Sequence, residues 1–204
     1  MVLSEVISIG KDIFLAIAAV TTAIVAVIGL RSWGRELKGK AEFEAARNLA
    51  RATYKLRDAL RDCRSPFYGV YELAEYNPSW SGPNQGEADQ LAYIYKNRFA
   101  PVWAAVQEFD SHVLEAETLW GLEIKVKTDQ FRACVQELNA AMQADIANKS
   151  SQDEDFKHDP EFAKQTKAKV TYSPDDETNE FNKRIRIAVN EIESQVRSHL
   201  RRNK

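Results

Sequence analysis

The residue in this sequence with the clearest potential for metal or acid–base chemistry is His112. Glu108 precedes it by four positions and Glu115 follows it by three, which places the three side chains on one helix face. Di-iron helical bundles use Glu-x-x-His on two helices together with further inward carboxylates. Here the order is reversed and the sequence holds no second copy. We therefore expect a solvated polar face beside Phe109 and Val113, and we expect neither a metal ion nor another cofactor.

A second candidate is an acidic string that surrounds Trp120. Its carboxylates could bind a cation or a basic peptide, but the simpler interpretation is that the indole covers the core while the acids are solvated. The sequence has no Gly-rich phosphate loop, no Gly-x-Ser-x-Gly and no His-Glu-x-x-His. Because no nucleophile, base and orienting group can be assigned to one pocket, we predict no enzymatic activity and no catalytic residue.

The two cysteines, Cys63 and Cys134, offer no paired chemistry either. They lie far apart in the sequence, and neither has a partner at metal-ligand or redox spacing. Each falls on the apolar face of a helical pattern, as a small core residue would. This usage is typical of a reducing cytoplasm. The net charge of −2 indicates no global attraction to nucleic acid, so we expect none as a partner.

The helices expected to carry these residues all come after an uncharged apolar run at residues 13–30. Its length is just enough to cross the ~30 Å hydrocarbon core as a helix, at about 1.5 Å per residue. The two hydroxyls in the run, Thr21 and Thr22, can bond to carbonyls one turn earlier. The sequence therefore predicts a transmembrane helix in the lipid bilayer, anchored by Ile13, Phe14, Leu15, Val20, Ile24, Val25, Val27, Ile28, Leu30 and the interfacial Trp33.

Two alternatives to a membrane anchor are a buried core helix and a cleaved signal peptide. A core helix usually keeps a polar face, and this run has none. A signal peptide has an apolar region of roughly 7–15 residues that ends at a small-x-small cleavage site. The present run is longer, and residues 29–35, where it ends, offer no such site.

Charges beside the run predict its orientation. Residues 1–12 carry one Lys or Arg, whereas residues 31–40 carry four, and the more cationic flank stays in the cytoplasm. We expect residues 1–12 outside, the span at 13–30, and residues 31–204 inside. The four flanking cations are also candidates for contact with anionic lipid: Arg31, Arg35, Lys38 and Lys40.

Small residues on one face of the run are candidates for self-association. They recur at spacings of three, four and three, which lets membrane helices approach closely. Alanine is also common in membrane helices for other reasons, and the sequence has no Gly-x-x-x-Gly. A homo-oligomer would use Ala16, Ala19, Ala23 and Ala26.

The remainder of the chain reads as four amphipathic helices and no strand of any length. Apolar stripes at spacings of three and four cover residues 35–64, 87–120, 122–148 and 176–202. Pro101 should kink the second helix or start another, Trp103 should widen its buried face, and Gly121 should end it. Turn formers fill residues 77–86, and a polar connection covers 149–176, with a short helix expected near 160–167. We therefore predict an all-α protein: residues 31–64 continue from the membrane into an antiparallel bundle completed by residues 65–204.

Two short patterns in the chain carry a resemblance. They are Ala116-Glu117-x-Leu119-Trp120-Gly121, and Asp175-Asp176-Glu177 followed by Phe181 and by Ile192-Glu193-x-x-x-Arg197-x-x-Leu200. These patterns resemble those of uncharacterised bacterial single-pass membrane-anchored helical proteins. The resemblance implies a helical protein of the bacterial inner membrane and carries no activity or site residues with it.

The function expected from these features is that of a membrane-anchored interaction or scaffold module that binds a protein partner. The first alternative is a membrane effector of a bacterial defence or toxin system that oligomerises through the alanine face. A single uncharged span offers no polar pore lining, which argues against it. The second alternative is a sensor of anionic lipid that uses the cationic helix after the span.

Overall fold

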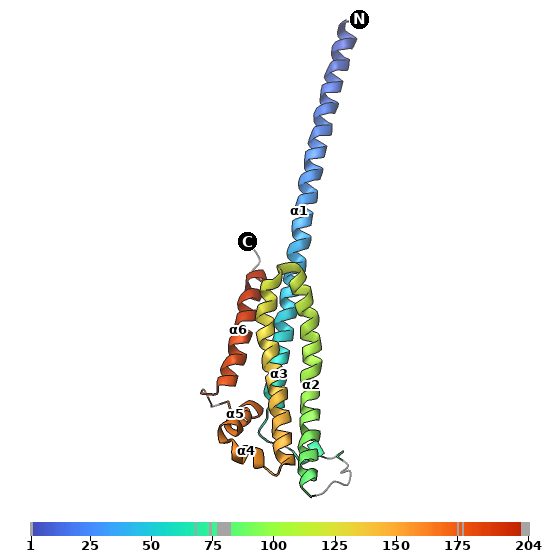
Figure 1. Ribbon diagram of the computed structural model, residues 1–204. Helices are drawn as coiled ribbons and strands as arrows, with labels where there is room; N and C mark the ends of the chain where they lie inside the picture. The colour runs from blue at the N-terminus through green and yellow to red at the C-terminus, as the bar shows by residue number, and fades with distance from the viewer. Residues whose placement is uncertain are drawn as a thin grey trace. The chain divides into compact units, whose positions relative to one another are not determined.

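The computed structural model describes residues 2–67, 69–73, 75–76, 83–174, 176 and 178–200. These residues form helices and no strand, which confirms the all-α prediction (Figure 1). The elements are α1 (Val2–Cys63), the 3-10 helix η1 (Val70–Leu73), α2 (Pro83–Trp120), α3 (Leu122–Ser150), α4 (Glu154–His158), α5 (Pro160–Val170) and α6 (Glu180–Leu200). Trp80 and most of the loop predicted at residues 77–86 lie outside the described residues.

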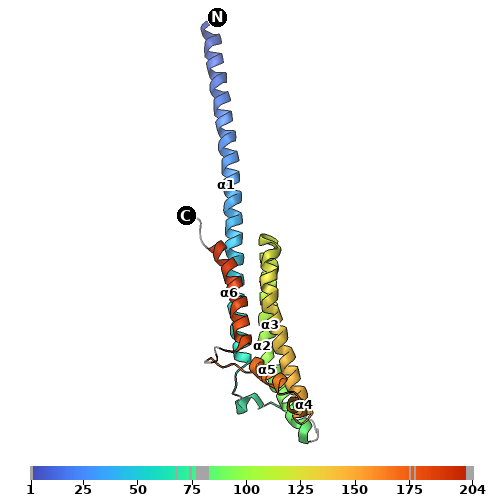
Figure 2. The ribbon, with the colours of Figure 1, turned by 60° about the vertical axis from the view of Figure 1, so that its left-hand side comes forward.

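Contacts between residues divide the chain into two units, Met1–Glu44 and Ala45–Lys204. Both units contain part of α1. In the second unit, α3 packs against α2, α5 and α6, and the short helix α4 contacts α3 and α5 (Figures 1 and 2).

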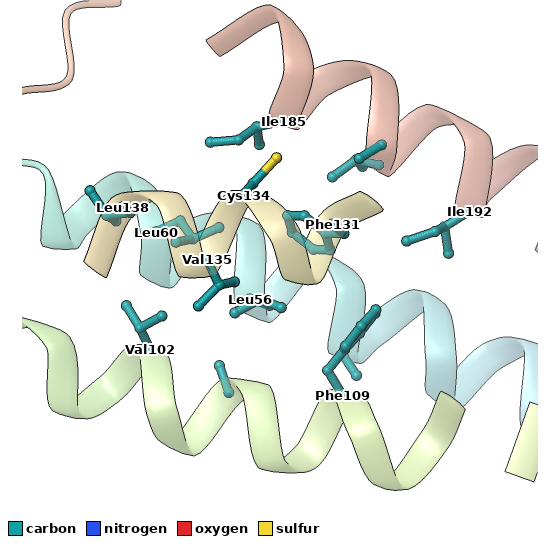
Figure 3. Close-up of a cluster of buried hydrophobic side chains, with 14 of the residues drawn as sticks. Leu56, Leu60, Val102, Phe109, Phe131, Cys134, Val135, Leu138, Ile185 and Ile192 are labelled. Carbon is teal, nitrogen blue, oxygen red and sulfur yellow. The ribbon is translucent and has the colours of Figure 1, made fainter. Parts of the chain in front are cut away.

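The core of the second unit takes one apolar stripe from each long helix. Figure 3 shows these side chains meeting from α1, α2, α3 and α6. Phe109 and Phe131 pack edge to face with ring centroids 5.6 Å apart. Each fully buried Leu, Ile or Phe contributes about 1.5–3 kcal/mol to folding. The largest fully buried apolar side chains are Leu49, Leu56, Leu60, Val102, Phe109, Val113, Ile124, Phe131, Leu138, Met142 and Ile192.

Helix α2 departs from the sequence prediction at two positions. It continues through Pro101, so the expected second helix does not start there. Pro101 is exposed, and water can therefore satisfy the carbonyl that the proline ring leaves without a donor. Trp103 is 52% exposed, so the prediction that it widens the buried face is wrong. It lies one position beyond the buried Val102, and one position turns a helix by about 100°.

Gly121 separates α2 from α3, as predicted. Its φ of 78° and ψ of −163° lie in a region that only glycine occupies without strain. Its N–H donates to the Glu117 carbonyl at 2.9 Å, which closes the last turn of α2. The next helix therefore begins directly at Leu122.

Much of the polar stretch at residues 149–176 is helical. The expected short helix is α5, and Asp159 caps it by accepting a hydrogen bond from the Phe162 N–H at 2.9 Å. Pro160 occupies its first turn, where no backbone donor is needed. The additional helix α4 follows a turn in which Gln152 and Asp153 both have positive φ.

Candidate functional site

The apolar segment of α1 is the most unusual surface of the first unit. One helix among the described residues is long and apolar enough to cross a membrane, and none of its apolar window is buried. The side chain of Ile13 lies outside the description. Contiguous exposed apolar surface of this kind is typical of contact with a membrane or another protein. The other predicted anchoring residues are at least 50% exposed: Phe14, Leu15, Val20, Ile24, Val25, Val27, Ile28, Leu30 and Trp33.

The two hydroxyls in this segment are satisfied within the helix, as predicted. Thr21 donates to the Ile17 carbonyl at 2.8 Å, and Thr22 donates to the Ala18 carbonyl at 2.9 Å. Neither hydroxyl requires water, so the segment has no unsatisfied side-chain donor that would oppose transfer to lipid.

The predicted self-association and lipid-contact residues lie on the same exposed helix. The alanines at 16, 19, 23 and 26 are all exposed, as are the cations at 31, 35, 38 and 40. Lys38 lies 3.8 Å from Glu42 at the ion-pairing atoms. The roles of these alanines and cations in self-association and in lipid contact stay predictions.

The sequence candidates for chemistry do not converge on one site. His112 Nδ1 lies 3.6 Å from a carboxylate oxygen of Glu115, whereas Glu108 accepts a hydrogen bond from Lys55 at 2.5 Å. In the part of the chain that the structure describes, no group of His, Cys, Asp and Glu side chains is arranged to hold a metal ion.

The cysteines are buried in the core, in agreement with the sequence prediction. Burial raises the pKa of the Cys63 thiol to about 12 and also raises that of Cys134. The neutral thiol is a weak nucleophile, so neither residue is set up for covalent chemistry at neutral pH.

Trp120 is partly buried and packs against the edge of the core, as expected from the sequence. Its ring stacks on His199 with centroids 4.3 Å apart, which joins the end of α2 to the end of α6. Glu115 and Glu123 on either side are exposed.

Sequence reasoning missed the most deeply buried charge among the described residues, Arg64. It directly follows α1 and is 1% exposed. Its guanidinium lies over the ring of Phe181 at 4.8 Å. Burial lowers the pKa of Arg64 to about 10. Its hydrogen bonds go to the carbonyls of Lys169 (2.5 Å), Ala168 (3.0 Å) and Thr171 (3.1 Å) and to Oδ1 of Asn182 (2.8 Å).

These acceptors explain why a charge can be buried there. The three carbonyls belong to the C-terminal end of α5, where helix carbonyls lack intrahelical donors and the helix dipole is negative. The backbone carbonyl of Arg64 in turn accepts the Tyr172 N–H at 2.7 Å. One side chain thus connects the ends of α1 and α5 to the start of α6.

A cavity of about 380 Å³ lies beside this guanidinium. Its walls come from the last turns of α1, from Arg64, from the segment after α5 and from residues 182–193 of α6. Arg57, Arg61 and Arg64 recur at spacings of four and three, a signal of a shared face that the sequence does contain. What the sequence could not indicate is that Lys183 and Arg186 of α6 line the same cavity.

A second arginine ties η1 to α2. Arg98 donates from Nε and Nη2 to the two carboxylate oxygens of Glu72, at 2.7 and 2.8 Å. It also donates to the backbone carbonyls of Ser65 and Phe67. The hydrogen bonds from Arg98 lower the pKa of Glu72, so its carboxylate stays ionised over the neutral range.

Comparison with known proteins does not extend this description: no protein-family model matches the chain, and no curated protein or solved structure matches it.

We expect Arg64→Met to lower the free energy of unfolding by about 3 kcal/mol or more, because it leaves buried carbonyls without donors. Arg57→Met is the matched control, since Arg57 is partly exposed and pairs with Asp58 at 2.9 Å. An exposed pair contributes about 0–1 kcal/mol. Thermal unfolding of the full-length protein in mild detergent, followed by circular dichroism, measures both. Equal melting temperatures for the two variants would contradict the role assigned to Arg64.

Proposed function

We propose that the protein is a single-pass membrane protein whose cytoplasmic antiparallel helical bundle binds a protein partner. Residues 13–30 would be the span, residues 1–12 would lie outside, and residues 31–204 would form the cytoplasmic part. The observation that carries this proposal is the exposed apolar segment of α1. The function is that of an interaction or scaffold module that holds its partner at the bacterial inner membrane.

Solvation supports the anchor. Leaving apolar surface in water costs about 25 cal/mol per Å², whereas the hydrocarbon core of a bilayer accepts the same surface. The helix also satisfies its own backbone groups, and the hydroxyls of Thr21 and Thr22 bond within it. The orientation follows from the four cations at residues 31–40, which favour the cytoplasmic side.

A surface on α3 supports the interaction role. Leu122 is 71% exposed and Val126 is 63% exposed, and their spacing of four places both on one face of the helix. Exposed apolar side chains that share one helix face are favoured contacts for a protein partner.

The anchor is tested by placing charges in the apolar segment. We expect Ile24→Arg combined with Val25→Arg to move the protein to the soluble fraction, because each arginine costs about 2.5–3.5 kcal/mol at the centre of a membrane helix. Leu114→Arg is the control, since it adds a charge at an exposed leucine of α2. Alkaline carbonate extraction of membranes measures the outcome. Retention of the doubly substituted protein in extracted membranes would contradict the proposed span.

The orientation is tested by cysteine labelling in intact cells. We expect Ser4→Cys to react with a membrane-impermeant maleimide, and we expect Ser198→Cys to react only after the cells are permeabilised. The native cysteines should not interfere, because both are buried and the pKa of each thiol is raised. The opposite labelling pattern would show that the bundle lies outside the cytoplasm.

The interaction role is tested by affinity purification of the full-length protein from native membranes. We expect a stoichiometric partner whose recovery falls at least tenfold in the Leu122→Asp, Val126→Asp double variant. Gln143→Asp with Ala147→Asp is the matched control, because it adds the same charge at the same spacing at exposed positions about 30 Å further along the same helix.

Two results would count against the interaction role. Equal loss of the partner in both double variants would mean that the apolar face of α3 is not the contact. Recovery of the protein alone as a defined oligomer would favour the effector alternative, in which Ala16, Ala19, Ala23 and Ala26 form the contact between spans.

A further inference from the structure

The lining of the cavity beside Arg64 includes five cations that come from separate parts of the fold. Arg57 and Arg61 belong to α1, Arg64 follows it, and Lys183 and Arg186 belong to α6. Tyr172 and Asn182 add a ring and an amide to the lining. The cavity lies entirely within the unit Ala45–Lys204.

Carboxylates compensate part of the positive charge in this lining. Asp58 accepts two hydrogen bonds from Arg57, at 2.9 and 3.0 Å, and lies 3.7 Å from Arg61, which also pairs with Asp62 at 3.3 Å. Asp176 accepts from the hydroxyl and the N–H of Thr178. Glu193 accepts from the Tyr54 hydroxyl at 2.7 Å and from Arg197 at 3.0 Å. Lys183 pairs with Glu180 at 2.6 Å, so the lining charges that these carboxylates do not pair are those of Arg64 and Arg186.

Two of the lining arginines have no carboxylate partner among the described residues. Arg64 donates only to neutral oxygens. Arg186 forms no ion pair with any residue that the structure describes. Arg186 is exposed, and a guanidinium presents its donors in a fork that matches a phosphoryl group. An anion in the cavity would place a negative charge near both arginines.

We propose that this cavity binds a phosphoryl anion, with Arg61 and Arg186 contacting its oxygens and Arg64 forming the cationic back wall. The phosphoryl group would belong to a free phosphorylated small molecule or to the headgroup of a lipid. The volume of about 380 Å³ is within the roughly 300–1,000 Å³ range of small-molecule sites. This site is independent of the proposed span and of the apolar face of α3.

The test uses the full-length protein in phosphatidylcholine nanodiscs, titrated with inorganic pyrophosphate by isothermal titration calorimetry. We expect saturable binding of one pyrophosphate per chain that weakens as salt is raised. Arg186→Gln and, separately, Arg61→Gln should each weaken binding about tenfold, because a charge-assisted hydrogen bond is lost. Arg64 is left intact because its substitution threatens the fold.

The matched control is Arg184→Gln, which removes the same charge two positions away on α6. Arg184 pairs with Glu137 at 2.8 Å and does not line the cavity. We expect the affinity of Arg184→Gln for pyrophosphate to stay within twofold of the wild-type affinity. Absence of saturable binding, or equal weakening in Arg184→Gln and Arg186→Gln, would overturn the proposal.

A second set of titrations distinguishes the two sources of the phosphoryl group. Nanodiscs with phosphatidic acid present a phosphomonoester headgroup, and nanodiscs with phosphatidylglycerol present anionic headgroups without one. If a lipid headgroup fills the cavity, pyrophosphate should bind more weakly in the phosphatidic acid discs alone. Equal affinity in both anionic discs would assign the site to a free phosphorylated molecule.

Discussion

A buried guanidinium constrains this fold more than any other single group. Arg64 is 1% exposed, and its donors must all find acceptors away from bulk water. The carbonyls at the end of α5 supply most of them, and Asn182 near the start of α6 supplies another. The end of α1, the end of α5 and the start of α6 must therefore meet at one point.

The apolar core and the arginine contacts act on different parts of the same helices. The core holds the last part of α1, from Ala46 on, together with α2, α3 and α6 through a continuous set of buried side chains, but apolar packing has little directional preference. The arginines act on helix ends: Arg64 binds the end of α5, and Arg98 of α2 binds Glu72 of η1 and the carbonyls of Ser65 and Phe67 that follow α1. Hydrogen bonds from a planar guanidinium have a fixed geometry, so they set which helix ends meet.

The two units of the chain present surfaces suited to different surroundings. Apolar side chains of the first unit are exposed along a helix whose hydroxyls bond internally, and such a surface is stable in hydrocarbon. The second unit has a conventional buried core and a cavity lined by arginine and lysine. An anchored protein with an anion site could respond to a phosphorylated ligand while it remains at the membrane, which joins the two proposals without making either depend on the other.

Local pattern was enough to predict most of the helices. An uncharged run marks residues 13–30, apolar side chains at spacings of three and four mark the buried faces, and Gly121 marks a break that only glycine tolerates, because each of these properties belongs to neighbouring residues. Tertiary structure alone decided that Trp103 is exposed, that α2 continues through Pro101 and that Arg64 is buried. It also brought Arg61 and Arg186 to one cavity. Arg64 bonds to Asn182, 118 positions away, and no spacing rule reaches across such a separation because the contact exists only after the helices have packed.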